Sequence, residues 1–473
     1  MSREATLVKN TIIFAIGNFS SKFLGILILP LYTAYLNASE YGYYDLVITT
    51  ASLILPLVSF QIYDGLYRNL LEEDKLEERK KNISSTFLIT VRNLVVFDVF
   101  YIIANTFYLN IQSGNLIIAY INVFILFTVY IQIARGLREN MVFSIAGILN
   151  TFLIVLFTVF FITKLDLKVS GLLIAMILSY GLCIVYLEVK LKVFRYIDFS
   201  MLDKNVSKSL IMYSLPLIPN TISWWIMNVS DRFLLTHFVG LDANGLYAIA
   251  NKFPSILLAI NSVFYLSWQE TSITEYNSKD RNEFYSKMFN NLLVFQFSLL
   301  LVLIAFTKPM MTLLVDREFF NAWKYVPFLY IGAIFYAFSS FYGTGFLSAK
   351  KTKGAFYSSI FGSLANIVMN IMLIPFIGIQ GASISTMLSF IIMWIIRIKQ
   401  TKSFFHIKIK KAQFLLLATL SILSIVLYYL DNVYLNYSLM IISLVSFLKF
   451  NQKLIAPIIG KMSIQWKKRQ KAS

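Results

Sequence analysis

The sequence predicts an all-α polytopic membrane protein with about 14 transmembrane helices. Three observations lead to this class: 58% of the 473 residues are hydrophobic, only 14% are charged, and the mean hydropathy is +0.69. Apolar stretches of the length that a helix needs to cross a hydrocarbon core recur from Thr11 to Phe450. The stretches are continuous rather than alternating, so we predict helices and exclude a β-barrel.

The predicted spans follow one another closely along the chain. They occupy residues 9–36, 41–68, 82–109, 115–134, 142–163, 168–189, 209–238, 243–269, 288–315, 322–349, 354–377, 379–396, 412–430 and 433–448. Prolines inside these runs should kink or break helices. They are Pro30, Pro56, Pro216, Pro219, Pro254 and Pro375.

Basic residues predict the orientation of these spans. Most of the 42 Lys and Arg fall in the termini and in one set of alternate loops. The opposite side of the membrane holds only Lys164, Lys168, Lys308, Arg317 and Lys324. Because cytoplasmic loops are enriched in Lys and Arg, both termini are expected in the cytoplasm, with an even number of spans. The same bias explains the net charge of +18 without a nucleic-acid partner.

An internal repeat indicates two lobes. Gly42 begins a Gly-x-Tyr pattern after one long span, and Gly245 begins the same pattern after another. We predict a six-helix lobe at residues 1–194, a cytoplasmic linker at 195–207, a second six-helix lobe at 208–402, and two further helices with a basic tail at 403–473. Both lobes would enter the membrane in the same direction, and transporters built from such parallel repeats bind substrate in a central cavity between the lobes.

Ionisable residues within spans are functional candidates, because charge at membrane depth is costly. Lys22 lies near mid-depth on a stripe with Asn18, while Arg232 and Lys252 lie at similar depth on consecutive helices. The predicted substrate-binding residues are Lys22, Arg232, Lys252, Asn18, Asn228 and Trp224. The residues predicted to serve coupling or structure are Asp231, Asp45, Asp98 and Arg92.

Internal pairing is the alternative for the same residues. Asp231 could pair with Lys252 and hold two helices together. We favour a cavity role for Lys22, Arg232 and Lys252, because pairing leaves an excess of cations.

Several classes of function are disfavoured by absences in the sequence. There is no G-x-x-x-x-G-K-[ST] loop to hold ATP. Two histidines, His237 and His406, and the single Cys183 offer no metal-binding pattern. We therefore expect no cofactor, no metal site and no enzyme activity, and the short outer loops argue against a membrane glycosyltransferase or polymerase.

Five segments together carry a family resemblance. They are Ser39-Glu40-Tyr41-Gly42, Asp64-Gly65-Leu66-Tyr67-Arg68, Asp231-Arg232-Phe233-Leu234-Leu235, Asp242 to Ala248 with Lys252, and Asn366 to Asn370 with Ile374-Pro375, Gly378 and Gly381-Ala382. With this order and spacing, the sequence resembles the Wzx-type oligosaccharide flippases of the polysaccharide-transporter family, which are related to MATE transporters and lipid II flippases in the MOP superfamily. The resemblance covers the first twelve predicted helices.

The resemblance implies a V-shaped, two-lobed flippase of the bacterial cytoplasmic membrane that works by alternating access. Its substrate would be an undecaprenyl-pyrophosphate-linked oligosaccharide, the repeat unit of an O antigen, capsule or other exopolysaccharide. Polysaccharide polymerase machinery would be a partner. Lys22, Arg232 and Lys252 match cavity-facing cations of the family. Proton or sodium coupling stays open, with Asp45, Asp98 or Asp231 as the carrier.

Two rival functions remain at this stage. A MATE-like cation-coupled multidrug exporter should have a carboxylate-rich cavity, whereas cations dominate the predicted one. A lipid II flippase would differ from the favoured function, that of an oligosaccharide flippase, only in its substrate.

Overall fold

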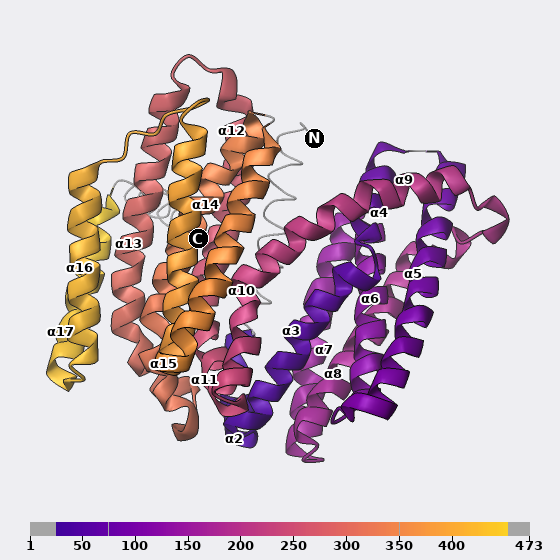
Figure 1. Ribbon diagram of the computed structural model, residues 1–473, viewed down its shortest axis with the longest axis horizontal. Coiled ribbons are helices and arrows are strands. Elements are labelled where there is room, and N and C mark those ends of the chain that lie inside the picture. Colours follow the sequence, from indigo (N-terminus) through magenta and orange to yellow (C-terminus); the bar gives the residue numbers. More distant parts are fainter. Residues whose placement is uncertain (1–24, 74, 350, 453–473) are drawn as a thin grey trace, which may run out of the picture. The chain divides into compact units, whose positions relative to one another are not determined.

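The structure is a computed structural model that describes residues 25–73, 75–349 and 351–452 (Figure 1). Every regular element among these residues is helical, so the predicted all-α class is confirmed. The α-helices are α2 (Leu29–Tyr35), α3 (Ala38–Val58), α4 (Ile62–Glu72), α5 (Leu76–Ala104), α6 (Gly114–Gly136), α7 (Asn140–Thr163), α8 (Lys168–Leu191), α9 (Lys204–Ser214), α10 (Ile218–Phe238), α11 (Leu241–Lys252), α12 (Pro254–Thr274), α13 (Arg281–Leu314), α14 (Val326–Ser348), α15 (Thr352–Thr401), α16 (Lys411–Tyr429) and α17 (Val433–Phe450).

Ten of the described helices are long and apolar enough to cross a membrane, or eleven if α11 and α12 form one broken span. The chain is therefore a multi-pass membrane protein. The prediction of about 14 spans also treats α15 as two helices, includes the more polar α10, and includes a first helix. Most of that first helix, residues 9–24, lies outside the described residues.

Prolines and one glycine break several of the predicted spans. The predicted span 41–68 is divided after Pro56, where Phe60 and Gln61 adopt positive φ and separate α3 from α4. Pro216 lies in a 3₁₀ turn between α9 and α10, and Pro254 begins α12 directly after α11 ends. These positions fit the proline ring, which removes a helical donor and clashes with the preceding turn.

Gly378 interrupts α15, as the sequence predicts. Its backbone has φ 56° and ψ −133°, a conformation that favours glycine. The boundary between the predicted spans 354–377 and 379–396 falls at this residue.

The chain divides into two compact units. The first lies within Met1–Lys252 and Ser363–Ala382, and the second within Phe253–Gly362 and Ser383–Ser473. This division differs from the predicted lobes at residues 1–194 and 208–402, which stay a prediction.

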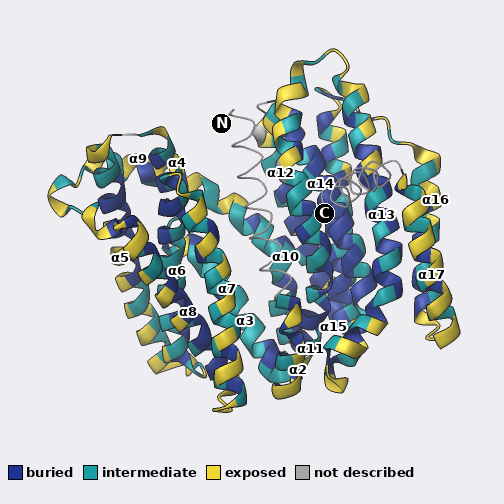
Figure 2. Cartoon of the chain, turned by 180° about the vertical axis from the view of Figure 1, so that it is seen from behind, coloured by how far each residue is buried: buried dark blue, intermediate teal, exposed yellow. Residues whose placement is uncertain are grey.

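The first unit packs α3, α5, α6 and α8 around buried aliphatic and tyrosine side chains. Ile121 and Ile125 of α6 and Leu173 of α8 are almost fully buried in this cluster. By contrast, α5 and α7 carry many exposed residues (Figure 2). Large apolar side chains are among them, such as Val95 and Phe152. Such surfaces suit contact with lipid tails.

The second unit has an aromatic core. Phe289 of α13 contacts Phe338 and Phe341 of α14, with ring centroids 5.2 Å apart in both pairs. Its helices α16 and α17 are largely exposed and apolar, as expected for surfaces that face lipid.

Candidate functional site

The candidate site lies in the first unit, where α3, α10 and α11 meet. Helix α3 begins with a capping box: the Glu40 backbone N–H donates to the Asn37 side chain at 2.8 Å, and the Asn37 backbone N–H donates to the Glu40 carboxylate at 3.0 Å. These bonds satisfy donors that the first helical turn leaves free. They fix the start of the helix that carries Asp45.

Small residues allow α3 and α11 to approach each other closely. A Cβ atom added to Gly42 would collide with the Leu241 backbone oxygen, and one added to Gly245 would collide with the Ala38 backbone oxygen. The Asn244 side chain donates to the Gly42 carbonyl oxygen at 2.8 Å. This contact positions the helix turn that follows Gly42, which contains Asp45, against α11.

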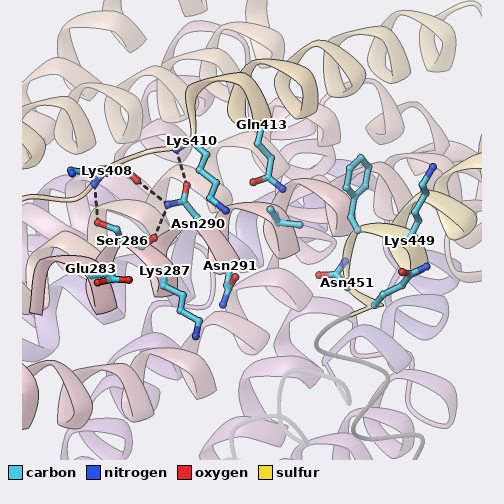
Figure 3. A pocket seen from close by; sticks show the side chains of 13 residues that line it. Glu283, Ser286, Lys287, Asn290, Asn291, Lys408, Lys410, Gln413, Lys449 and Asn451 are labelled. Atoms are coloured by element: carbon cyan, nitrogen blue, oxygen red, sulfur yellow. Dashed lines mark hydrogen bonds between the residues drawn. The ribbon is translucent and has the colours of Figure 1, made fainter. Parts of the chain in front are cut away.

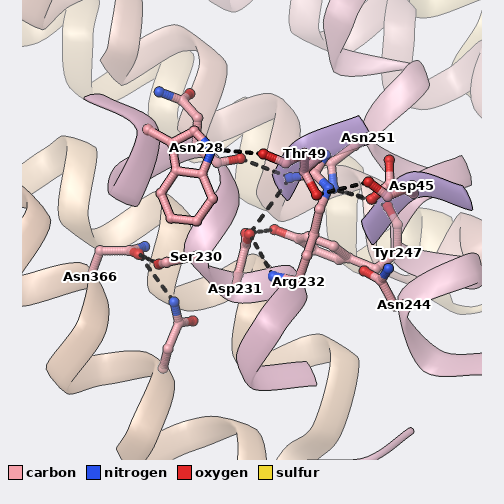
Figure 4. A network of polar contacts seen from close by, with 12 residues as sticks. Asp45, Thr49, Asn228, Ser230, Asp231, Arg232, Asn244, Tyr247, Asn251 and Asn366 are labelled. Carbon is pink, nitrogen blue, oxygen red and sulfur yellow. Dashed lines mark hydrogen bonds and ion pairs between the residues drawn. The ribbon is translucent and has the colours of Figure 1, made fainter. Parts of the chain in front are cut away.

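Arg232 of α10 is the centre of an ionic network (Figure 4). Its Nε donates to Asp45 Oδ2 of α3 at 2.6 Å, and its Nη1 lies 3.7 Å from Asp231 Oδ1. The same Nη1 donates to the Asn228 carbonyl oxygen at 2.8 Å. The side chains of Arg232 and Asp45 are only 11% and 15% exposed, so the pair is shielded from solvent.

Asp231 is the most buried member of the network. It is 1% exposed and accepts a hydrogen bond from the Tyr247 hydroxyl of α11. The Arg232 guanidinium lies 5.8 Å from the Tyr247 ring centroid. Tyr247 is therefore next to both Asp231 and Arg232.

Lys252 ends α11, is half-buried, and interacts electrostatically with Asp45 and Arg232. Lys252 and Arg232 thus belong to one electrostatic neighbourhood, and their shared role at an anionic site stays a prediction. Among the described residues, Asp45 and Asp231 offset these two cations, so the excess of cations expected from the sequence stays a prediction. Lys22 and Asn18 lie outside the described residues.

The polar face of α3 contacts α10 through Trp225, which is not among the site residues selected from the sequence. Trp225 Nε1 donates to the Thr49 carbonyl oxygen at 3.1 Å and to Ser52 Oγ at 3.0 Å. Trp224, the residue selected from the sequence, contributes its carbonyl oxygen to the Asn228 side chain at 2.7 Å. The sequence contains one indication of this contact: Trp225 is seven residues from Arg232, and this spacing places both side chains on one face of the helix.

Asn366, which belongs to the family pattern but was not selected as a site residue, makes a further buried contact to α10. Its Oδ1 accepts from Ser230 Oγ at 3.0 Å and from Asn370 Nδ2 at 3.1 Å. These residues extend the polar network to α15.

Two other candidates make separate contacts. Asp98 of α5 accepts from Asn122 Nδ2 of α6 at 2.9 and 3.1 Å. Arg92 is exposed and donates to Asn93, whose side chain donates in turn to the Val58 carbonyl oxygen at 2.9 Å. The contacts of Asp98 and Asn93 join neighbouring helices, and their assignment to coupling stays a prediction.

The predicted span 379–396 ends one residue before Arg397, and that boundary is wrong. The structure places Arg397 in α15 of the second unit, 2% exposed. It donates to the Ser339 carbonyl oxygen at 2.6 Å, to Ser358 Oγ at 3.0 Å and to Ser359 Oγ at 3.2 Å. A basic residue next to a loop is indistinguishable in sequence from a loop residue, because hydropathy alone places the helix end before it.

In the part of the chain that the structure describes, no group of three or more His, Cys, Asp or Glu side chains is arranged to hold a metal ion. The described network therefore consists of ion pairs and hydrogen bonds within the helices of the first unit.

Comparison with known proteins identifies the family of the chain. The model of the family described as "Polysaccharide biosynthesis protein" matches residues 7–273, and the MatE model matches residues 216–372. The first match covers more than half of the chain and includes Asp45, Arg232 and Lys252. The chain belongs to the polysaccharide biosynthesis protein family.

One relative and two solved structures resemble the chain over most of its length. An uncharacterized membrane protein of Methanocaldococcus jannaschii is 23% identical over 444 residues, which covers 84% of each chain. The inward-facing structure of a multidrug resistance MATE family transporter of the MOP superfamily has a TM-score of 0.69 at 14% identity and covers 82% of this chain and 98% of that one. The lipid II flippase MurJ, in an inward closed conformation, also gives 0.69, at 16% identity, and covers 95% and 100%. The fold is thus the one shared by membrane transporters and flippases of the MOP superfamily.

Proposed function

We propose that this protein is a flippase that moves an undecaprenyl-pyrophosphate-linked oligosaccharide from the cytoplasmic to the outer leaflet by alternating access. The observation that carries the proposal is the polysaccharide biosynthesis family match over residues 7–273, which contains the whole Asp45–Arg232–Lys252 network. The product would serve the synthesis of a surface polysaccharide such as an O antigen, capsule or exopolysaccharide.

The ion pair between Arg232 and Asp45 suggests how a pyrophosphate is bound. A pyrophosphate carries several negative charges, and a guanidinium binds phosphate oxygens through paired charge-assisted hydrogen bonds. An incoming pyrophosphate competes with Asp45 for Arg232 and gains the charge of Lys252. Lys22, at mid-depth of the first predicted helix, supplies a third cation. The prenyl chain stays in the lipid, where its apolar surface is already accommodated.

The same exchange provides a place for ion coupling. When Asp45 loses Arg232, it becomes an uncompensated carboxylate at membrane depth, which favours capture of a proton or a sodium ion. The membrane potential alone also favours outward movement of negative charge, by about 2.3 kcal/mol per charge per 100 mV. Ion coupling through Asp45 or Asp231 would therefore add to the driving force that the membrane potential supplies. Neither driving force needs ATP or a cofactor.

The proposed setting is the bacterial cytoplasmic membrane, with both termini in the cytoplasm. The bias of Lys and Arg toward one set of loops supports this orientation. The flipped oligosaccharide would then reach polysaccharide polymerase machinery on the outer side.

Two observations favour a second candidate, a MATE-like cation-coupled multidrug exporter. The MatE model matches residues 216–372, and two carboxylates, Asp45 and Asp231, lie in the described network. Carboxylates at membrane depth suit cationic drugs. A lipid II flippase shares the prenyl-pyrophosphate chemistry and differs in the attached saccharide.

The test is translocation of a fluorescent prenyl-pyrophosphate oligosaccharide in proteoliposomes. Wild type is compared with Arg232→Ala, Lys252→Ala and Lys22→Ala, and with Lys190→Ala, an exposed lysine at the end of α8, as the matched control. We expect flipping by wild type and the control, and at least a tenfold loss in the three other variants. The opposite result would be a wild type that moves no such lipid but exports cationic dyes when a sodium or proton gradient drives it. This result would overturn the proposal in favour of the exporter.

A further inference from the structure

The second unit contains a polar pocket of about 890 Å³ where the start of α13, the segment before α16 and the end of α17 come together (Figure 3). It is separate from the ionic network of the first unit in sequence and in the residues that form it. Neither the family pattern nor the proposed function makes use of it.

One wall of the pocket is an extended segment bound along α13. The Lys408 backbone N–H donates to Ser286 Oγ at 2.9 Å, and the Asn290 side chain donates to the Lys408 carbonyl oxygen at 2.9 Å. The Lys410 backbone N–H donates to Asn290 Oδ1 at 2.9 Å, and the His406 backbone N–H donates to Asn282 Oδ1 at 3.1 Å.

The spacings explain why this segment and the helix fit together. Two residues of extended chain advance about 6.6–6.8 Å, and four residues of α-helix advance about 6 Å. Residues 406, 408 and 410 can therefore pair in succession with Asn282, Ser286 and Asn290. In an extended segment alternate side chains share one side, so Lys408 and Lys410 are held together while Ile407 is buried.

Four lysines line the pocket: Lys287, Lys408, Lys410 and Lys449. All four are exposed, and among the described residues none of them forms an ion pair. Among the lining residues that the structure describes, Glu283 is the only carboxylate. The remaining sequence, 453–473, contains no acidic residue that could balance these charges.

Apolar surface continues from the pocket along the neighbouring helices. Leu415 and Leu416 of α16 are 62% and 51% exposed, and Leu448 of α17 is 55% exposed. The pocket thus has the chemistry of a membrane surface site, with cations at the helix ends and a lipid-facing surface beyond them. The sequence places the same helix ends on the cytoplasmic side, whose leaflet is rich in anionic lipid.

We propose that this pocket binds the phosphate headgroup of an anionic phospholipid, whose acyl chains lie along α16 and α17. Basic pockets between transmembrane helices on the cytoplasmic side bind such headgroups. The bound lipid would fasten the two C-terminal helices to α13. This role is independent of the substrate that the protein moves.

The experiment measures lipid retention by native mass spectrometry on the full-length protein in neutral detergent. Cardiolipin and phosphatidylcholine are titrated into wild type, into the pocket variant Lys408→Gln/Lys410→Gln/Lys449→Gln, and into the control variant Lys353→Gln/Lys399→Gln/Lys402→Gln. The control removes the same charge from exposed lysines of the same unit that do not line the pocket. Thermal unfolding of each protein in detergent shows that the comparison is between folded proteins.

We expect wild type and the control to retain cardiolipin at a concentration at least tenfold below that for phosphatidylcholine. The pocket variant should lose at least tenfold in cardiolipin retention, because each lysine near a membrane surface contributes about fivefold. Equal losses in both variants would mean general charge attraction and would overturn the proposal. So would retention of a prenyl pyrophosphate in place of cardiolipin, or complete displacement of cardiolipin by millimolar inorganic pyrophosphate, since either result would assign the pocket to another phosphate ligand.

Discussion

Gly42 of α3 and Gly245 of α11 lie against each other's helices in a reciprocal contact. A Cβ atom on Gly42 would meet the backbone oxygen of Leu241, four residues before Gly245, and one on Gly245 would meet that of Ala38, four residues before Gly42. The two glycines are the corresponding positions of the internal repeat predicted from the sequence. The repeat therefore corresponds to a contact in which its two copies pack on each other in the same way.

The first prediction concerns this crossing. Gly42→Ala and Gly245→Ala should each destabilise the protein by roughly 1–3 kcal/mol, because the added methyl group meets backbone that cannot move aside easily. The measurement is the midpoint of thermal unfolding in detergent. Gly147→Ala and Gly181→Ala are the controls, since nothing lies within 4 Å of a Cβ atom at either position. Equal midpoints in all four variants would contradict the packing described.

The second prediction concerns the pair Asp45 and Arg232. Asp45→Asn or Arg232→Gln alone should lower stability, by about 3–5 kcal/mol if the remaining charge stays buried, because removal of one partner leaves the other uncompensated. The double variant should recover part of this loss. A thermal unfolding cycle over the four proteins measures the coupling, expected at roughly 0.5–3 kcal/mol. Strictly additive effects would mean that the two side chains do not interact in the membrane protein.

The third prediction separates structure from ion coupling at Asp98. Asp98→Asn keeps an oxygen that can accept from Asn122 but removes the charge, whereas Asp98→Leu removes the hydrogen bonds as well. We expect Asp98→Asn to flip lipid-linked oligosaccharide at close to the wild-type rate, and Asp98→Leu to lose stability by about 1–3 kcal/mol. Flipping that fails in Asp98→Asn, with normal thermal stability, would instead assign the coupling ion to this residue.

Much of the fold follows from patterns that the membrane imposes on sequence. Continuous apolar runs predicted the helices, and the break at Gly378 was placed correctly, because glycine is the residue that tolerates positive φ. The interruption at Phe60 and Gln61 was missed, since neither residue disfavours a helix strongly and the preceding Pro56 is also tolerated within helices.

The candidate site was predicted in composition and only partly in its contacts. Asp45 was selected from the sequence, and its carboxylate and the Ser52 hydroxyl both contact α10. Which residues of α10 they meet depends on the rotation of that helix, and this is set by the approach of α3 to α11 at Gly42. Trp225 was missed for that reason. Arg397 was misplaced because its partners, Ser339, Ser358 and Ser359, are distant in sequence and neutral.

The last prediction tests the role of Arg397. Its guanidinium bonds to three separate positions, Ser339, Ser358 and Ser359, and a lysine cannot reproduce that planar set of donors. Arg397→Lys should therefore destabilise the protein by roughly 1–3 kcal/mol, because at least one buried acceptor loses its donor. Lys399→Gln, two residues further on and exposed, is the control and should leave the unfolding midpoint unchanged. If Arg397 instead bound substrate phosphate, Arg397→Lys would keep wild-type stability and lose flipping, so the two measurements made on the same purified variant decide between a structural and a substrate-binding arginine.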